Sequence, residues 1–366
     1  MIELFRRIAA NLARRALALH DEIKVRAGST VVHGPANVPL ADDQCAVVSL
    51  MKNAEWFIES FLEHHFALGV AHIVIVDNGS TDRTVEIAAR FERVTVVHNS
   101  LPAKRYECLL RTINAHLVLR GGWVLFADSD EMLEVPFVAT PFPNLLKYCN
   151  QEGFTAVVGQ MLDLFSPLPY GEQAKMNYPD ALATCRFYST EKLEPLAYHD
   201  PNMDLAWFLR ENACDDLGVM LFRGGLRAEV FDETPFLSKH SLVRNTADVA
   251  LMTHPHCAGR VRVADLTLCL RHYKLAGPWL ARDRASHATR TWDHGEDARR
   301  LQKVMGDRFC ITPVHSREWA GPDFLLEEGL LYASARARAA LANSPRSLPV
   351  SESRVSPSQL ESHDQR

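Results

Sequence analysis

The amino-acid sequence predicts an α/β fold with a mostly parallel central sheet that is flanked by helices. Between residues 45 and 127, short apolar segments alternate with longer amphipathic segments. The aliphatic run 73–76 has no polar interruption, as is typical of parallel strands that are buried on both faces. Strand–helix units that repeat at this length form a parallel sheet with helices on both sides. In such sheets, ligands bind beyond the carboxyl ends of the strands.

The individual elements follow from the same periodicity. We expect helices of the first half at 54–68, 81–91 and 104–119, and strands around them at 45–50, 72–76, 94–97 and 123–127. After residue 134 the regularity decreases, because proline-rich loops interrupt it. There we expect two further strands, at 219–222 and 266–270, and helical segments at about 276–305 and 323–342.

Composition divides the chain into four parts. We expect an amphipathic helix at 1–25, an α/β domain at 42–275, a helical extension at 276–342 and a disordered tail at 343–366. The tail contains seven serines and three prolines but few apolar residues, too few to form a packed core.

The N-terminal helix is basic as well as amphipathic. Its apolar residues fall near one face, and its arginines lie mostly elsewhere. One interpretation is a helix packed on the main domain. The alternative is attachment to an anionic membrane surface, which helices of this kind favour.

Overall composition excludes several classes of protein. The formal net charge of −5 provides no global basic field for nucleic acid. No apolar run approaches the roughly 20 residues that span a bilayer, and arginines interrupt any signal-peptide core. The eight cysteines form no CxxC pair, which favours reduced thiols. We therefore expect a cytoplasmic protein, with peripheral attachment to the inner membrane face as an option.

Asp77 directly follows the strand expected at 72–76. Asn78 and Gly79 permit the tight turn that comes next. A carboxylate at this strand end can accept a hydrogen bond from a nucleotide base or a ribose hydroxyl, and a purely structural role in the turn is the alternative. No GxGxxG motif precedes Asp77, which disfavours a nicotinamide or flavin site.

Two carboxylates leave the end of the strand expected at 123–127. Asp128 and Asp130 stand two residues apart, and both cannot stay ionised at low cost without a cation. Mg²⁺ and Mn²⁺ prefer such oxygen ligands and also bind phosphate oxygens. Bound there, a divalent ion would neutralise the charge that develops on a diphosphate leaving group. We therefore predict a metal site at Asp128 and Asp130, with a solvated acidic loop as the alternative.

Several motifs together resemble the family-two-like glycosyltransferases of GT-A fold. In particular they are similar to the bacterial branch related to galactan-type transferases. The resemblance is dense over about 45–135 and sparse beyond. The segments that carry it are 48–55, 63–65, 68–70, 77–82, 126–131, 224–227, 237–239 and 270–274.

The resemblance implies roles for individual residues. Asp77 would contact the nucleotide base or ribose, and Asp128 and Asp130 would bind the metal. Asn53 lies where one residue is inserted relative to the usual motif, so that either it or Glu55 would make the corresponding nucleotide contact. Arg111 would face the nucleotide, with a solvated arginine as the alternative.

The second half offers further candidates for the same site. A histidine often completes the metal shell in this fold, and His272 and His254 are the candidates that we retain, with His272 favoured because it follows an apolar strand. Arg227 and Lys239 are candidates for holding diphosphate oxygens. Inverting transfer needs a carboxylate base near the acceptor hydroxyl. Asp232 and Asp163 are the candidates for that base.

These observations predict a glycosyltransferase that uses Mn²⁺ or Mg²⁺. It would move a hexose from a UDP- or GDP-sugar, with UDP preferred, to a hydroxyl of a glycan or lipid-linked saccharide with inversion. A sugar nucleotidyltransferase is one alternative, although residues 48–55 contain no glycine for a phosphate loop. A non-catalytic carbohydrate-binding or scaffold protein with the same fold is the other.

Overall fold

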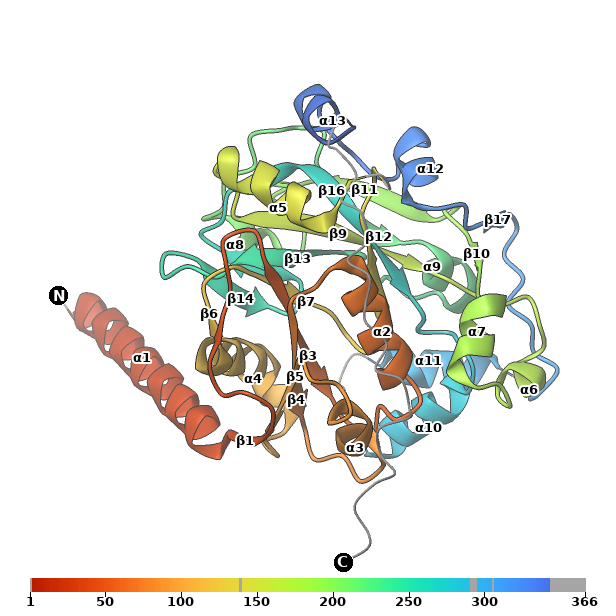
Figure 1. The fold of residues 1–366 in the computed structure, drawn as a ribbon, viewed down its shortest axis with the longest axis horizontal. Helices are drawn as coiled ribbons and strands as arrows, with labels where there is room; N and C mark the ends of the chain where they lie inside the picture. The colour runs from red at the N-terminus through yellow and green to blue at the C-terminus, as the bar shows by residue number, and fades with distance from the viewer. Residues whose placement is uncertain (1, 138–139, 290–294, 305, 343–366) are drawn as a thin grey trace, which may run out of the picture.

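The computed structural model describes residues 2–137, 140–289, 295–304 and 306–342 (Figure 1). The tail expected at 343–366 lies outside the described residues, as does a part of the helical segment expected at 276–305. Helix α1 (Ile2–Gly28) projects from the main body, and the last described helix, α13 (Ala335–Ala342), lies at the top in this view (Figure 1).

A nine-stranded sheet forms the centre of the molecule. Its strands follow the order β1-β5-β4-β3-β7-β13-β9-β16-β8. Six strands run in one direction: β3 (Cys45–Met51), β4 (His72–Asp77), β5 (Val94–His98), β7 (Trp123–Phe126), β9 (Ala156–Asp163) and β16 (Val263–His272). Three run against them: β1 (Thr30–His33), β8 (Glu131–Glu134) and β13 (Ser238–Arg244). The predicted α/β class with a mostly parallel sheet is therefore confirmed.

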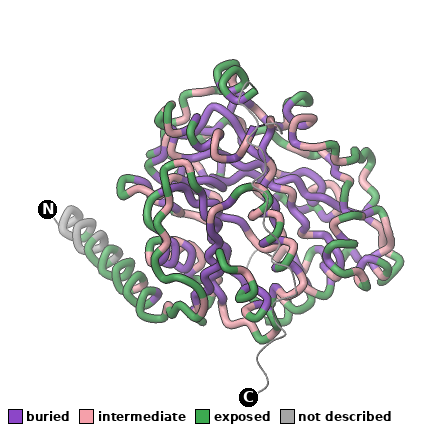
Figure 2. Tube along the Cα trace, viewed as in Figure 1, coloured by how far each residue is buried: buried purple, intermediate pink, exposed green. Residues whose placement is uncertain are grey.

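Both faces of the sheet are covered, as the aliphatic run in β4 requires. Ile73 and Ile75 pack in an apolar cluster with α2 (Ile58–Leu68) and α5 (Phe142–Gln151). The alternate residues Val74 and Val76 pack in a second cluster with α4 (Ala103–Val118). Figure 2 shows the buried strands at the centre of the molecule. A strand whose two faces are both buried has no polar alternation, which explains the sequence pattern.

Shorter elements connect and extend this core. Helix α3 (Thr84–Ala88) is shorter than the predicted 81–91, and the expected strand at 219–222 is β12 (Met220–Gly224). The remaining elements of the body are β2 (Val38–Pro39), β6 (Leu119–Arg120), α6 (Tyr170–Gln173), α7 (Tyr178–Thr184), β10 (Phe187–Tyr188), β11 (Leu193–Ala197), α8 (Ala206–Leu209), α9 (Leu226–Phe231), β14 (Ala250–His254) and β15 (Cys257–Gly259).

The C-terminal segment returns to the sheet. It consists of α10 (Trp279–Thr289), α11 (Glu296–Lys303), β17 (Arg317–Glu318), α12 (Pro322–Glu327) and α13 (Ala335–Ala342). Leu325 and Leu341 belong to the apolar cluster that lines one face of the sheet. Ala333 forms a bridge with Leu266 of β16. The last helices thus contribute directly to the central core.

Helix α1 contacts the body through its C-terminal part. Val25 is buried, and its carbonyl oxygen accepts a hydrogen bond from the Asn99 side chain at 2.9 Å. Leu12, Leu19 and Ile23 keep 57–61% of their surface exposed. None of the helices in the described part of the chain is long and apolar enough to cross a membrane.

Candidate nucleotide and metal site

Several of the predicted site residues lie where parallel strands end. In the strand registers, Met51 of β3 faces Asp77 of β4, and His272 of β16 faces Asp163 of β9. Asp128 and Asp130 follow β7, which pairs in parallel with β3. Carboxyl ends of parallel strands meet at one edge of a sheet, where ligands of α/β proteins bind.

Asp77 is buried and organises the turn that follows it. Its carboxylate accepts hydrogen bonds from the backbone N–H of Ser80 at 3.0 Å and of Gly79 at 3.3 Å. The ring nitrogen Nδ1 of His98 lies 3.0 Å from the same carboxylate. Burial opposes ionisation, but the hydrogen bonds from Ser80 and His98 outweigh it and hold the pKa of Asp77 below its usual value. Asp77 is therefore ionised at neutral pH.

Asn53 lies beside this turn at the end of β3. Its backbone adopts a positive φ of 53°, a conformation that asparagine tolerates better than most residues. The side-chain oxygen of Asn53 accepts a hydrogen bond from the N–H of Thr81 at 2.7 Å, and its N–H donates to Ser80 Oγ at 2.9 Å. The structure thus brings Asn53 and the turn after Asp77 together. Glu55, one turn further on, pairs instead with Arg83.

Cations compensate the acidic segment that follows β7. Arg111 of α4 forms an ion pair with Asp128, and Lys239 of β13 forms one with Glu131. The Glu131 carboxylate also accepts the N–H of Asp128 at 2.8 Å. Partial burial opposes ionisation of Asp128, but the charges of Arg111 and Lys239 hold the pKa of this carboxyl well below its usual range. The Asp128 side chain keeps 43% of its surface exposed, so that a ligand can reach it.

His272 lies between two carboxylates. Its Nε2 is 3.7 Å from Asp130, and its Nδ1 is 2.6 Å from Asp163. Burial disfavours the imidazolium, but the charge of Asp130 and the hydrogen bond with Asp163 outweigh it and raise the pKa of His272. Of the two predicted histidines, His272 is thus the one placed beside Asp130. His254 lies on β14, where its Nδ1 accepts the N–H of His256 at 3.2 Å.

The two predicted base candidates lie in different environments. Asp163 is 4% exposed, and Arg227 Nε donates to its second oxygen at 2.9 Å. Asp232 follows α9 with a positive φ of 53°, and its exposed carboxylate pairs with Lys303 of α11. Arg227 and Lys239, which we expected to hold diphosphate oxygens, both pair with carboxylates of the protein in this structure.

Two further residues near the acidic segment escaped the sequence reasoning. Glu131 is the third acid of the run after β7 and is buried against Lys239. Arg282 of α10 donates to the carbonyl oxygens of Lys274 and Ala276 at 3.1 and 3.0 Å. Burial lowers the pKa of Arg282, and the negative charge of Asp130 offsets only a part of this effect. Glu131 could have been predicted as a site residue, because it continues the run of acids at 128–131. The sequence around Arg282 has only the pattern of a helix, which does not indicate a site.

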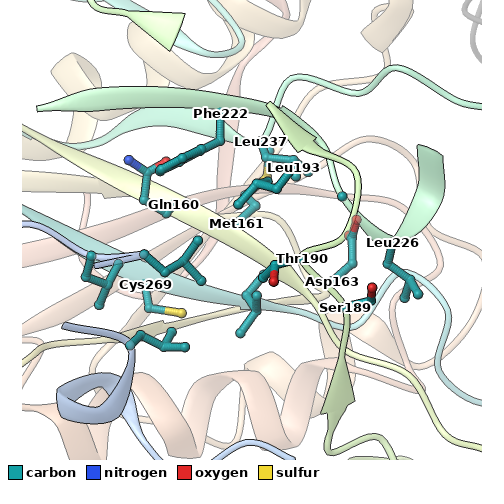
Figure 3. Close-up of a pocket in the computed structure, with 15 residues that line it drawn as sticks. Gln160, Met161, Asp163, Ser189, Thr190, Leu193, Phe222, Leu226, Leu237 and Cys269 are labelled. Carbon is teal, nitrogen blue, oxygen red and sulfur yellow. The ribbon is translucent and has the colours of Figure 1, made fainter. Parts of the chain in front are cut away.

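A small cavity beside Asp163 is too narrow for a sugar nucleotide. Figure 3 shows that its wall is mostly apolar, with Met161, Leu193, Phe222 and Leu237 around it. Its volume of about 20 Å³ accommodates no more than a water molecule. We take the strand ends as the candidate site because Asp128, Asp130 and His272 lie there and Asp128 keeps 43% of its side-chain surface exposed.

The donor set at the strand ends fits a divalent cation in part. Within the described ranges, no three His, Cys, Asp or Glu side chains are arranged so that they could by themselves hold a metal ion. Asp128, Asp130 and Nε2 of His272 offer two kinds of ligand that Mn²⁺ accepts, and further positions would stay open for phosphate oxygens. Such a partial shell suits an ion that binds together with a diphosphate.

Two solved structures are similar to this chain, each over less than half of either chain. A glucosyl-3-phosphoglycerate synthase from Mycobacterium tuberculosis, in complex with Mn²⁺, UDP and glucosyl-3-phosphoglycerate, is 26% identical over 33% of this chain and 44% of that one, with a TM-score of 0.24. A mannosyltransferase from Pyrobaculum calidifontis, in complex with GDP-Man and Mn²⁺, is 18% identical over 44% of this chain and 46% of that one, with a TM-score of 0.25. No curated protein matches the sequence.

A family model matches the part of the chain that builds the strand ends. Residues 47–211 match the model of glycosyl transferase family 2. The matched segment contains β4, β7 and β9, and therefore Asp77, Asp128, Asp130 and Asp163. With the mixed α/β architecture, the match confirms the predicted GT-A fold class.

Proposed function

We propose that the whole chain is a metal-dependent glycosyltransferase. It moves a hexose from a nucleotide-diphosphate sugar, with UDP preferred, to a hydroxyl of a glycan or lipid-linked saccharide, with inversion. The observation that carries the proposal is the pair Asp128 and Asp130 beside His272, at the strand ends of a glycosyl transferase family 2 domain. Within the family, the motifs at 48–55, 77–82 and 126–131 support the bacterial branch related to galactan-type transferases.

Three side chains would hold the cation, Mn²⁺ or Mg²⁺. Asp128 and Asp130 provide carboxylate oxygens, and His272 provides Nε2, because its Nδ1 is engaged by Asp163. When bound, such a cation supplies Lewis-acid stabilisation of the departing diphosphate. Arg111 pairs with Asp128, so its guanidinium would also lie close to the diphosphate and could donate hydrogen bonds to the phosphate oxygens.

The end of β4 would hold the nucleotide. Asp77 is ionised but only 3% exposed, so it would accept the uracil imide N–H or a ribose hydroxyl through a lone pair that Ser80, Gly79 and His98 do not use. Asn53 fixes the adjoining turn through Ser80 and Thr81. Lys239 and Arg227 would contact the diphosphate only by leaving the carboxylates with which they now pair. Of the two base candidates, Asp232 alone has an exposed carboxylate.

Thermal unfolding with nucleotides tests this proposal. We expect UDP with Mn²⁺ to raise the Tm by several degrees, because a ligand at about 100 times its Kd stabilises by about 2.7 kcal/mol. UDP alone, and Mn²⁺ alone, should have a much smaller effect. GDP, CDP and ADP serve as matched ligands that report base preference. If no nucleotide shifts the transition, the non-catalytic scaffold interpretation replaces the transferase.

The exposed face of α1 supports contact with an anionic membrane. Leu12, Leu19 and Ile23 point away from the body, while Val25 on the other side of the helix is buried against it. The arginines at positions 6, 7, 14 and 15 add positive charge along the same helix. A lipid-linked acceptor would lie at such a surface.

Flotation with vesicles that contain anionic lipid tests this contact. We expect the full chain to float with the vesicles, and the variant Leu12→Asp/Leu19→Asp to remain at the bottom, because charged residues on the apolar face oppose insertion. Vesicles of neutral lipid should recover less protein. Equal recovery of both proteins would contradict membrane contact through α1. A change of oligomeric state in the variant would point to a second copy of the chain instead.

A further inference from the structure

We propose that Asp163 is a positioning residue, which fixes the ring of His272 so that Nε2 faces Asp130. The inference rests on the proposed function, because it assigns Asp163 a task in the metal site. It also removes Asp163 from the candidates for the general base.

The first argument is the geometry between the two strands. Asp163 and His272 face each other in the parallel register of β9 and β16, and both are buried. Asp163 Oδ1 lies 2.6 Å from His272 Nδ1. An ionised carboxylate only accepts hydrogen bonds, so that Nδ1 must carry the proton. When the ring is neutral, the lone pair of Nε2 therefore faces Asp130, at 3.7 Å. Histidine ligands of metals are commonly oriented by a carboxylate in this way.

The second argument is that Asp163 is itself held in place. Arg227 Nε donates to its other oxygen at 2.9 Å, and the Arg227 side chain is 5% exposed. With one oxygen on the histidine and the other on the arginine, the carboxylate has a single orientation. A general base must instead reach the acceptor hydroxyl directly or through one water. A buried carboxylate that is engaged on both oxygens is poorly suited to that task.

The third argument is the network that holds Arg227. Its Nη1 lies 3.3 Å from Glu296 and 3.6 Å from Glu233. Arg300 in turn contacts Glu233 at 2.7 Å and Asp283 at 2.6 Å. Acidic and basic side chains thus alternate along this network, from Asp283 and Arg300 through Glu233 and Arg227 to Asp163. Buried ion pairs contribute little net stability compared with apolar residues. We infer that the network fixes the geometry of Asp163 and, through it, that of His272.

Replacing Asp163 with asparagine should reverse the histidine tautomer. Arg227 Nε needs an acceptor, so the amide oxygen of the new side chain would turn towards Arg227. The amide N–H₂ would then face Nδ1 of His272, which would become an acceptor. The ring proton would move to Nε2 and block the position that faces Asp130. Loss of such an orienting partner lowers metal affinity by about 10- to 100-fold.

Two measurements test this inference. Titration of Mn²⁺ in the presence of UDP, followed by electron paramagnetic resonance of the free ion, gives the metal affinity of wild type and Asp163→Asn. ¹⁵N chemical shifts of histidine-labelled protein without metal, at a pH where the ring is neutral, give the tautomer of His272. We expect Nδ1–H in the wild type, Nε2–H in Asp163→Asn, and a Mn²⁺ affinity that is about 10- to 100-fold weaker in the variant.

A matched control is available on β16, the strand that carries His272. Asp265 of β16 is buried and binds Tyr148 and Arg336, as Asp163 binds its own two partners. Asp265→Asn should lower stability but leave Mn²⁺ affinity unchanged. If Asp163→Asn does not fold, the tautomer of His272 in the wild type still tests the inference. A proton on Nε2 in the wild-type protein would overturn it.

The other outcomes are also distinct. Unchanged Mn²⁺ affinity of Asp163→Asn with loss of sugar transfer would overturn the inference and restore Asp163 as a base. If the wild type binds no Mn²⁺ with UDP, the proposed function fails. The tautomer of His272, which is measured without metal, would still decide whether Asp163 orients the ring.

Discussion

Replacing Asp128 with asparagine is expected to abolish the stabilisation that Mn²⁺ and UDP provide together. The amide oxygen can still accept from Arg111, so the fold should survive, but the carboxylate that binds the cation is lost. Since metal stabilisation of a leaving group is worth several kcal/mol, transfer should fall at least about 100-fold. Thermal unfolding with and without the ligands, and transfer assays, measure the two effects.

The control for Asp128→Asn removes a carboxylate from an exposed ion pair that lies elsewhere. Glu194 pairs with Arg223 at 2.7 Å, and its side chain is 52% exposed. Glu194→Gln should keep the full ligand-dependent shift in Tm, because exposed pairs of this kind contribute little. A ligand-dependent shift that persists in Asp128→Asn would contradict the assignment of the metal site to this strand end.

Replacing Lys239 with methionine is expected to lower the free energy of unfolding by about 3–5 kcal/mol, because it leaves the buried carboxylate of Glu131 without its cation. The Lys239 side chain is 5% exposed and that of Glu131 is 1% exposed. Urea unfolding followed by circular dichroism measures the loss, and a lower Tm should accompany it.

A double variant separates this charge effect from lost packing. Lys239→Met/Glu131→Gln removes both charges, while the new amide oxygen can still accept the N–H of Asp128. The double variant should recover a large part of the stability that Lys239→Met loses. If the two variants are equally unstable, the lysine acts through packing and not through the ion pair.

The strand-end residues that follow aliphatic runs were the most predictable part of the site. Asp77 and Asp128 each come after a run that is buried on both faces, and the length of the run alone fixes where the strand ends. The sequence also marks His272 as the end of an apolar strand. For these residues the local sequence pattern is sufficient to predict the site, because residues that follow a parallel strand lie at the edge of the sheet where ligands bind.

The partners of the charged residues could not be predicted, because they depend on long-range register. Asp163 and His272 lie 109 positions apart, and nothing local indicates that β9 and β16 pair in parallel with these residues opposite. Because their partners were unknown, Arg227 and Lys239 were predicted to bind phosphate oxygens. Their carboxylate partners, Asp163 and Glu131, lie 64 and 108 positions away.

The return of the last helices to the sheet sets the smallest piece of this protein that can be produced on its own. A chain that stops after β16 would lack Leu325, Leu331 and Leu341, which cover one face of the sheet, and would leave an apolar surface in water. It would also lack Arg300, the cation that pairs with the buried carboxylate of Glu233. A soluble protein that contains the strand-end site therefore needs the chain through α13, and versions that end earlier should aggregate.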